Sequence, residues 1–281
     1  ADLARAPLPP LPGPGRPPGP GPGQGPGQGL LPFRLVSNPE AAPSSGVDYA
    51  RSRAYWEAQP PTVSAMLGGV DATHGPDVRG SLALLEGLGF RAPPAPGSRA
   101  LDCGAGVGRV ACHVLAPRFE AVDLCEADGR FLARAVRDLG RSAGQAFPCA
   151  LQDLRAQPGA YDLVWVQWVL NYLEDGDAAA FLRRAGGWLK GGGAARVVVK
   201  ETHAKAGAPD WHDRADASVC RGAERFARVF AAAGLRVVAE AEAEGMPAGL
   251  LPVRAWVLVP DEIGSAGADG APASAPTSAQ P

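Results

Sequence analysis

The sequence predicts an α/β fold in which helices cover both faces of a mostly parallel, doubly wound sheet. Three observations support this prediction. Strand-like and helix-like segments alternate along the chain. A glycine-rich turn follows the first strand-like run. Residues 161–170 are almost continuously apolar, as strands buried on both faces of a parallel sheet are, and residues 194–201 are predicted to be another buried strand.

The first half of the predicted domain contains two strand–helix units. "RALDC" (residues 99–103) is a short β-rich run, and "RVACHVLAPRF" (109–119) is helix-like. "EAVDLCE" (120–126) is predicted to be the second strand. In residues 127–140, apolar positions recur at helical spacing.

The second half continues the alternation. "AAAFLRRAGGWLK" (178–190) predicts a helix that ends at "GGG", and residues 222–235 predict another helix. Residues 236–244 and 253–260 are predicted strands joined by a short segment. This short connection predicts an antiparallel edge.

Composition divides the 281 residues into three parts. The predicted domain spans residues 47–261, and the hydrophobic content of 46% suits a globular core. Residues 1–46 are dominated by Pro and Gly, and residues 262–281 repeat that composition. Such segments bury too little apolar surface to offset their ordering entropy, so we expect both to be disordered. A linker is favoured over a polyproline docking segment in residues 1–46.

Charge and cysteine content narrow the class of protein. The net charge is −2 and no basic stripe is present, which argues against nucleic acid as the partner. No apolar stretch approaches the roughly 20 residues of a membrane span. Five cysteines without a CxxC pair argue against a disulfide framework and against a metal site. A reducing compartment, the cytoplasm or the nucleus, is expected.

The central motif is "LDCGAGVGR", Leu101–Arg109, between the first strand and the next helix. Its glycines at 104, 106 and 108 permit positive φ and close approach of a ligand to the backbone. Ligands of open α/β sheets lie at this end of the strands. A glycine turn alone has an equally good interpretation as a tight strand–helix turn, and dehydrogenases use a similar one.

Residues around the turn favour S-adenosyl-methionine over a dinucleotide. Glu126, at the end of the second strand, is placed to accept hydrogen bonds from ribose hydroxyls. "LQD" (151–153) follows the third strand, where methyltransferases often contact adenine. Arg109 is suited to the methionine carboxylate, which a dinucleotide lacks. The alternative for Arg109 is an exposed helix arginine.

At this point the chain closely resembles the eukaryotic protein α-N-terminal methyltransferases. The matching segments keep the family's order over the whole predicted domain. They are "YWEAQPPTVSAMLGG" (55–69), "LDCGAGVGR" (101–109), "LQD" (151–153), "YDLVWVQWV" (161–169), "AFLRR" (180–184) and "DASVCR" (216–221). The first and last are much more specific than the glycine turn.

The resemblance implies a class I S-adenosyl-methionine-dependent methyltransferase fold, Rossmann-like, with a seven-stranded, mostly parallel sheet and an antiparallel edge strand. It implies methyl transfer to the free α-amine of proteins that begin X-Pro-Lys or similar. It also implies an N-terminal helical substrate-binding extension. The implied cofactor-binding residues are Gly104, Arg109, Glu126, Leu151, Gln152 and Gln167.

On the substrate side, the resemblance places Trp56, Trp168 and Leu67 in a peptide channel. Indole rings suit a substrate proline and attract a cationic amine. Core packing is the alternative for both tryptophans, most seriously for Trp168 inside an apolar strand. Asp213 and Asp216 match an acidic pair that receives Lys or Arg at the third substrate position, with Ser218 assisting. Their three-residue spacing would let both face the same way on a helical turn. Their alternative is an exposed loop or a helix N-terminal cap, because "DASVCR" is also typical of a helix start.

The chain departs from the family at the amine. Tyr172 stands where the family has His, and Thr202 where it has Asn; with Asp216 they are the candidate catalytic residues. Asn171 and His203 lie next to these positions and are the candidates to substitute for the missing His and Asn, but adjacent residues on a strand usually point away. Leu251 stands where the family has a tyrosine.

Three outcomes follow: N-terminal methylation, a shifted peptide preference, or binding of cofactor and peptide without turnover. We favour the first, since the peptide-channel motifs are intact. A small-molecule methyltransferase would leave those motifs unexplained.

Overall fold

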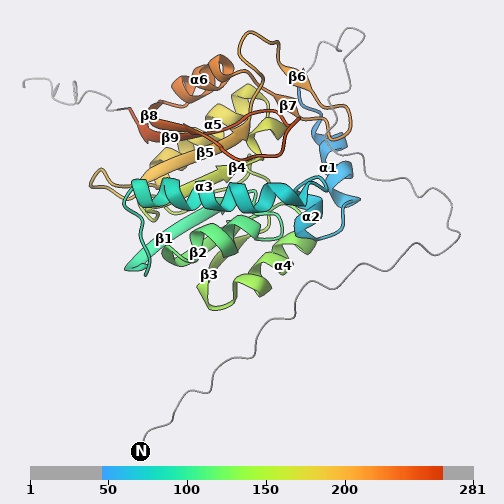
Figure 1. The fold of residues 1–281 in the computed structure, drawn as a ribbon. Coiled ribbons are helices and arrows are strands. Elements are labelled where there is room, and N and C mark those ends of the chain that lie inside the picture. Colours follow the sequence, from blue (N-terminus) through green and yellow to red (C-terminus); the bar gives the residue numbers. More distant parts are fainter. Residues whose placement is uncertain (1–45, 262–281) are drawn as a thin grey trace, which may run out of the picture. The chain divides into compact units, whose positions relative to one another are not determined.

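The computed structural model describes residues 46–261, and a seven-stranded sheet forms its centre (Figure 1). The strand order is β3-β2-β1-β4-β5-β9-β8. The strands are β1 (Ala95–Cys103), β2 (Phe119–Cys125), β3 (Ala143–Phe147), β4 (Leu163–Gln167), β5 (Arg196–Thr202), β8 (Leu235–Glu242) and β9 (Val253–Pro260). Strands β1 to β5 pair in parallel, and β9 runs antiparallel to both β5 and β8. The predicted mostly parallel sheet with an antiparallel edge is confirmed, and β9 lies one position inside that edge.

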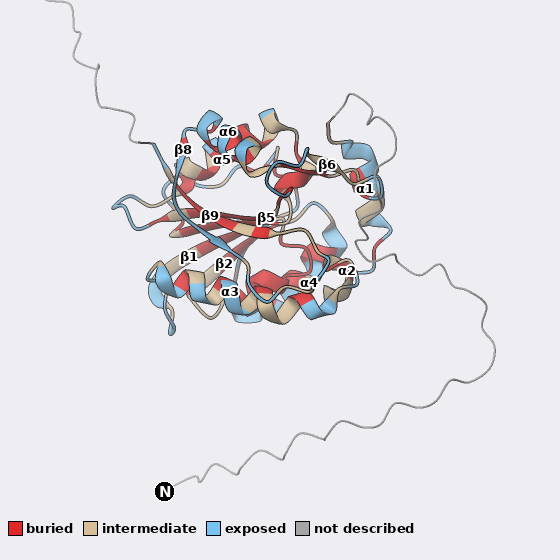
Figure 2. Ribbon diagram, turned by 45° about the horizontal axis from the view of Figure 1, so that its top comes forward, coloured by how far each residue is buried: buried red, intermediate tan, exposed pale blue. Residues whose placement is uncertain are grey.

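Helices cover both faces of this sheet, and residues on the strands and on the covering helices are buried (Figure 2). On one face, α5 (Asp175–Trp188) and α6 (Ala223–Ala232) bury Phe181 and Phe226. On the other, α3 (His74–Gly87) and α4 (Gly129–Leu139) bury Leu85 and Leu132. The doubly wound arrangement that the alternating pattern predicts is therefore present.

Three local expectations need correction. The helix predicted over residues 109–119 begins at residue 109 as predicted but ends at Leu115, with residues 111–115 (η2, Ala111–Leu115) in π-helical form, because Pro117 cannot continue a helix. The strand predicted over 161–170 stops at Gln167, and the chain turns into a 3₁₀ segment, η4 (Leu170–Tyr172). A two-stranded hairpin of β6 (Trp211–His212) and β7 (Val219–Cys220), which the sequence pattern did not predict, follows β5.

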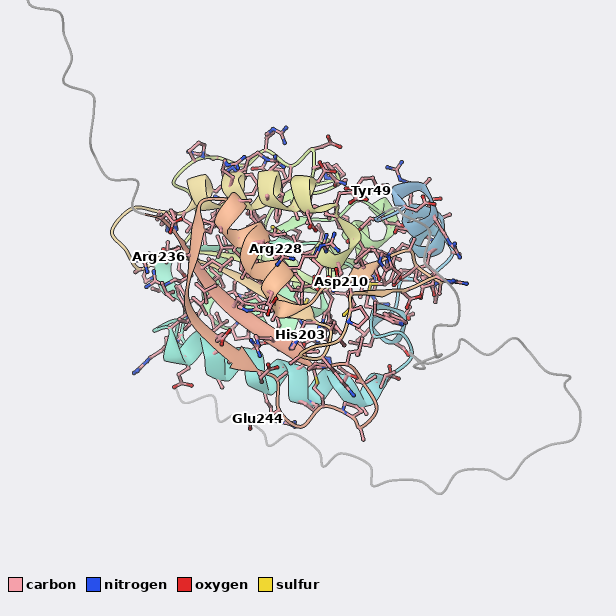
Figure 3. All side chains as sticks on the ribbon, turned by 90° about the horizontal axis from the view of Figure 1, so that it is seen from above. Tyr49, His203, Asp210, Arg228, Arg236 and Glu244 are labelled. Carbon is pink, nitrogen blue, oxygen red and sulfur yellow. The ribbon has the colours of Figure 1, made fainter. Side chains whose placement is uncertain are left out.

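The N-terminal extension consists of α1 (Tyr49–Glu57), α2 (Val63–Met66) and η1 (Asp71–Thr73), which leads into α3. Asp48 and Thr62 cap α1 and α2 by accepting hydrogen bonds from backbone N–H groups. Tyr49, at one end of α1 (Figure 3), donates to Asp177 of α5 at 2.5 Å. This bond ties the extension to the α5 side of the domain.

The segments expected to be disordered, 1–46 and 262–281, lie outside the described residues apart from Gly46. Within residues 46–261, no helix has the length and apolar character to cross a membrane. The same residues contain no group of three or more His, Cys, Asp or Glu side chains arranged to hold a metal ion. All five cysteines are free thiols.

Candidate active site

A cavity of about 850 Å³ opens at the carboxyl ends of β1, β2 and β4. Its walls come from the glycine turn, the residues after β2 and β3, and helix α1. All six residues predicted to bind the cofactor line it: Gly104, Arg109, Glu126, Leu151, Gln152 and Gln167. The structure thus brings together side chains from four separate sequence motifs.

Two positions of the glycine turn need glycine, because of their backbone conformation and because neighbouring residues lie close to them. Gly108 has φ +81°, and a Cβ there would lie 2.9 Å from the Cα of Ala135 on α4. Gly106 has φ +54°, and a Cβ there would lie 2.7 Å from the Sδ of Met66. Both values fall in the left-handed region that favours glycine. The turn therefore brings α2 and α4 close to the cavity wall.

Glu126 is fixed at the end of β2 by backbone donors. Its Oε2 accepts from Gly106 N at 2.9 Å, and its Oε1 accepts from Asp128 N at 2.9 Å. Burial raises the pKa of this carboxyl group. Each oxygen retains a second lone pair, so the group remains able to accept from ligand hydroxyls.

Arg109 is not an exposed helix arginine. Its side chain is 5% exposed, lines the cavity, and its Nη1 lies 2.7 Å from Oδ2 of Asp77 on α3. Gln167 Nε2 donates to the same carboxylate. Asp77 was missed in the sequence because it lies outside every recognised motif, and only the fold brings α3 to the glycine turn.

Asp102, in the motif before the glycine turn, is a second residue that sequence reasoning missed. It is 2% exposed and lines the cavity, and its Oδ2 has no hydrogen-bond partner among the described residues. Burial raises its pKa to about 7, against the opposing charge of Arg109. A carboxylate with one unpartnered oxygen beside an arginine matches a ligand with both a cationic and an anionic group, such as the amino-acid end of S-adenosyl-methionine.

A smaller cavity of about 150 Å³ adjoins the first. Four residues line both cavities: Trp56, Met66, Trp168 and Tyr172. The predicted substrate residues Leu67, Asp216 and Ser218 line only the smaller cavity, as do Thr202 and Leu251. The two predicted tryptophans therefore lie at the junction of the two cavities.

Trp168 is not packed as a strand residue. It directly follows β4 and has φ +53°, a conformation that is uncommon for a residue other than glycine. Its indole Nε1 is buried without a partner in the described part of the chain, and the Arg109 guanidinium lies 5.1 Å from its ring centroid. Strained backbone and an unused donor are characteristic of binding sites.

Tyr172 and Asp216 form a direct pair. The tyrosine hydroxyl donates to Asp216 Oδ2 at 2.6 Å, and Ser218 N donates to Asp216 Oδ1 at 3.0 Å. Burial and the charge of Asp216 hold the pKa of Tyr172 well above its ordinary value. The ring of Trp56 meets Tyr172 edge to face at 5.9 Å. Tyr172 is therefore a neutral donor here.

Asp213 lines neither cavity. The helical turn considered for this segment is absent, since Asp213 and Asp216 lie in the turn between β6 and β7. Ala217, with φ +59°, lets Ser218 N fold back onto Asp216. Burial, and next the charge of Asp216, raise the pKa of Asp213, which places the two carboxylates within electrostatic reach of each other.

His203, next to Thr202, and Asn171, next to Tyr172, differ in whether they face the smaller cavity. His203 is buried, with its Nδ1 against Ala204 O and its ring facing Trp256, so it points away from both cavities as expected. The expectation for Asn171 was wrong. Because the chain leaves β4 and enters η4, Asn171 lines the smaller cavity and donates to Glu201 Oε2 and Thr202 O.

Glu201 is a further cavity residue that the sequence did not single out. Its Oε1 accepts from Val169 N and Leu170 N, both at 2.6 Å. Burial raises its pKa to about 7. It anchors the turn that carries Trp168 and Asn171.

The fold and the paired cavities define an S-adenosyl-methionine-dependent methyltransferase. The larger cavity lies at the carboxyl end of a doubly wound sheet and presents opposite charges beside a glycine turn. More specifically, the chain belongs to the family described as "AdoMet dependent proline di-methyltransferase", whose pattern matches residues 45–259.

Relatives agree with this assignment. The mouse protein "N-terminal Xaa-Pro-Lys N-methyltransferase 1" is 37% identical over 214 residues, 75% of this chain and 94% of the mouse protein. The Drosophila melanogaster "Alpha N-terminal protein methyltransferase 1" is 38% identical over 76% of each chain. A solved SAM-dependent methyltransferase of Leishmania major has a TM-score of 0.68 at 32% identity, covering 75% of this chain and 82% of that one. The Burkholderia thailandensis 1,6-didemethyltoxoflavin-N1-methyltransferase, solved with S-adenosylhomocysteine, shares the fold, with a TM-score of 0.61 at 16% identity.

Proposed function

We propose that this chain transfers methyl groups from S-adenosyl-methionine to the free α-amine of protein N-termini of the X-Pro-Lys type. One observation carries the proposal: the cavity with the cofactor residues and the cavity with Asp216 share the walls Trp56, Met66, Trp168 and Tyr172. A methyl donor in the first cavity and an amine in the second would meet at these four side chains.

The protein's own residues have a limited chemical task. The bound cofactor supplies an activated methyl group, so the protein has to hold a neutral amine in line with it and exclude water. An α-amine has a pKa of about 7.7–8.0, which leaves a useful neutral fraction without a strong base. Asp216 is the candidate acceptor for the amine proton, and Thr202 is the candidate hydrogen-bond acceptor that orients the nitrogen.

Tyr172 is proposed to position Asp216 and not to act as a base. A neutral tyrosine that already donates to Asp216 is not available to accept a proton. In this proposal it holds the Asp216 carboxylate toward the junction of the cavities. Trp56 packs against the Tyr172 ring edge to face.

Asp213 and Asp216 are proposed to select the basic third residue of the substrate. Burial is the larger cause of the raised pKa of Asp213, and repulsion by the charge of Asp216 is the second. A Lys or Arg side chain that binds here would relieve this repulsion. An acidic third residue would increase the same repulsion, so the pair would also reject it. Ser218 is proposed to assist from the same hairpin.

The second candidate function is binding of cofactor and N-terminal peptide without turnover. The Tyr172–Asp216 hydrogen bond favours it, since it occupies the carboxylate that the reaction would use. A methyltransferase with a shifted peptide preference is the intermediate case.

Two further assignments rest on composition. For the Pro-rich residues 1–46, a docking segment for a proline-recognising partner is proposed as the alternative to the favoured linker, since Pro-rich sequences are common ligands of such partners. The protein is proposed to act in the nucleus, the cytoplasm or both, which five free thiols support.

The test uses labelled S-adenosyl-methionine with an X-Pro-Lys peptide, its N-acetylated copy and an X-Pro-Glu copy. The proposal requires label on the free X-Pro-Lys peptide, little on X-Pro-Glu and none on the acetylated copy. Cofactor and peptide binding without label would establish the second candidate instead. Label on the acetylated peptide would exclude the α-amine as the acceptor.

A further inference from the structure

Asp77 of α3 collects donors from three different parts of the fold. Its carboxylate is 1% exposed and lines neither cavity. Arg109 Nη1 lies 2.7 Å from Oδ2, and Lys200 Nζ lies 2.6 Å from Oδ1. Gln167 Nε2 lies 2.9 and 3.0 Å from the two oxygens. These donors come from the glycine turn, β5 and β4.

The three donors divide into two kinds. Arg109 and Gln167 line the cofactor cavity, whereas Lys200 does not. Away from the cavity, Lys200 Nζ donates to two further groups of α3, Ser81 Oγ at 2.8 Å and the Asp77 carbonyl oxygen at 3.2 Å. Within residues 46–261, Asp77 is the one side chain that accepts a hydrogen bond from Arg109. The orientation of Arg109 toward the cavity therefore depends on Asp77.

The charges of this cluster do not balance. One carboxylate faces two cations, Arg109 and Lys200, so these three side chains carry a formal charge of +1, and the other acidic group near Arg109 is Asp102, whose pKa burial raises to about 7. Burial alone raises the pKa of Asp77, but the charges of Lys200 and Arg109 outweigh it and hold that pKa below its ordinary value. Burial lowers the pKa of Lys200. A ligand carboxylate at the cavity wall would compensate the surplus positive charge.

We propose that Asp77 is a positioning residue that orients Arg109 and Gln167 toward the carboxylate of the cofactor's amino-acid part. Asp77 itself remains behind the wall and touches no ligand. Helix α3 follows the segment that carries Met66 and Leu67, which line the smaller cavity. Asp77 therefore also connects this wall of the smaller cavity to the cofactor site. The proposal concerns cofactor binding alone, so it stands or falls independently of the peptide substrate.

The experiment compares two ligands by calorimetry on the full chain. S-adenosylhomocysteine carries the amino-acid part, and 5′-methylthioadenosine lacks it. For Asp77→Asn we expect the preference for S-adenosylhomocysteine over 5′-methylthioadenosine to fall at least tenfold, with 5′-methylthioadenosine affinity within threefold of the wild type. A helix that merely lost stability would weaken both ligands alike, and equal weakening or an unchanged preference overturns the proposal.

Two further variants complete the design. Ser81→Ala removes a contact of Lys200 but leaves Asp77 with Arg109 and Gln167, so its ligand preference should stay within threefold of the wild type. Asp77→Glu keeps the charge of the cluster but displaces the carboxylate by one methylene, so the preference should fall while the fold is retained. If Asp77→Asn does not fold, Asp77→Glu decides, and an unchanged preference in that variant overturns the proposal.

Discussion

The Tyr172 hydroxyl donates to Asp216 Oδ2 at 2.6 Å, across the junction between the cofactor cavity and the smaller cavity. The two residues lie 44 positions apart, one in η4 and the other in the β6–β7 turn. Their contact links the turn after β4 to the hairpin after β5. It also joins a departure from the family, a tyrosine in place of a histidine, to a residue that matches the family, the aspartate of "DASVCR", in one hydrogen bond.

Removing this donor should weaken the use of peptide and spare the cofactor. Hydrogen bonds to charged groups contribute about 1.5–3 kcal/mol, so Tyr172→Phe should lower kcat/KM for an X-Pro-Lys peptide by about tenfold or more. The ring contact with Trp56 is retained in this variant. Steady-state kinetics and S-adenosylhomocysteine binding measure the two effects, and a wild-type kcat/KM would refute the positioning role of Tyr172.

Restoring a base at this position should accelerate the reaction. Histidine has an ordinary pKa of about 6.5, so Tyr172→His offers a neutral imidazole at pH 7.5. We expect a higher kcat than in the wild type and a rate that falls as pH drops through about 6.5. A pH–rate profile shows both, and a slower enzyme with an unchanged profile would contradict the assignment of this position to the amine.

Asp216 and Asp213 should differ in importance. Asp216 lines the smaller cavity and Asp213 does not. Asp216→Asn should therefore weaken peptide binding at least tenfold and leave cofactor affinity unchanged. Asp213→Asn should mainly reduce the preference for Lys over Ala at the third peptide position. Peptide titrations measure both effects, and loss of cofactor affinity in Asp216→Asn would contradict its role.

Asp102 should make stability depend on pH in a defined direction. Its pKa is raised to about 7 in the folded protein, against about 3.9 in an unfolded chain. The folded state therefore holds this proton longer, and the carboxyl group costs stability increasingly as pH rises from about 4 to about 7, with no further change above. Asp102→Asn should thus raise Tm relative to the wild type more at pH 8 than at pH 5. Calorimetry at the two pH values checks this, and a difference in Tm that shrinks with pH would have the wrong sign.

Gly106 should tolerate a side chain poorly, chiefly because φ +54° is strained for other residues. An added Cβ would also lie 2.7 Å from Met66 Sδ, so that flexible side chain on the cavity wall would have to move. Gly106→Ala should lower stability by roughly 1–3 kcal/mol and weaken S-adenosylhomocysteine binding. Gly191→Ala is the matched control, because nothing lies within 4 Å of its added Cβ. Equal effects of the two substitutions would remove the argument for a close approach at the turn.

The sequence predicted those parts of the fold and site that local patterns determine. Apolar runs and helical spacing specified the order of the main elements, and the glycine turn, Glu126 and Gln167 were placed correctly around one cavity. Asp77 was missed because its role depends on packing of α3 against β4 and β5, which no local pattern records. The turn at Trp168 was missed because an unbroken apolar run does not show where the strand ends.

The hairpin that carries Asp213 and Asp216 could not be predicted from sequence patterns either. Strands of two residues, Trp211–His212 and Val219–Cys220, have no detectable period. The capping spacing of the aspartates instead favoured a helical turn. Tertiary contacts decided the outcome: Ser52 Oγ of α1 donates to the Asp216 carbonyl oxygen, and Gly222 N donates to Asp210 Oδ1.

The position of the transferred methyl group tests the central claim most directly. After reaction of an X-Pro-Lys peptide with S-adenosyl-methionine, fragment mass spectra distinguish methyl groups on the α-nitrogen from those on the lysine side chain. The shared walls of the two cavities predict methylation of the α-nitrogen alone, and its loss in Asp216→Asn. Methyl groups on the lysine side chain, or a bound cofactor with an unmodified peptide, would contradict the account.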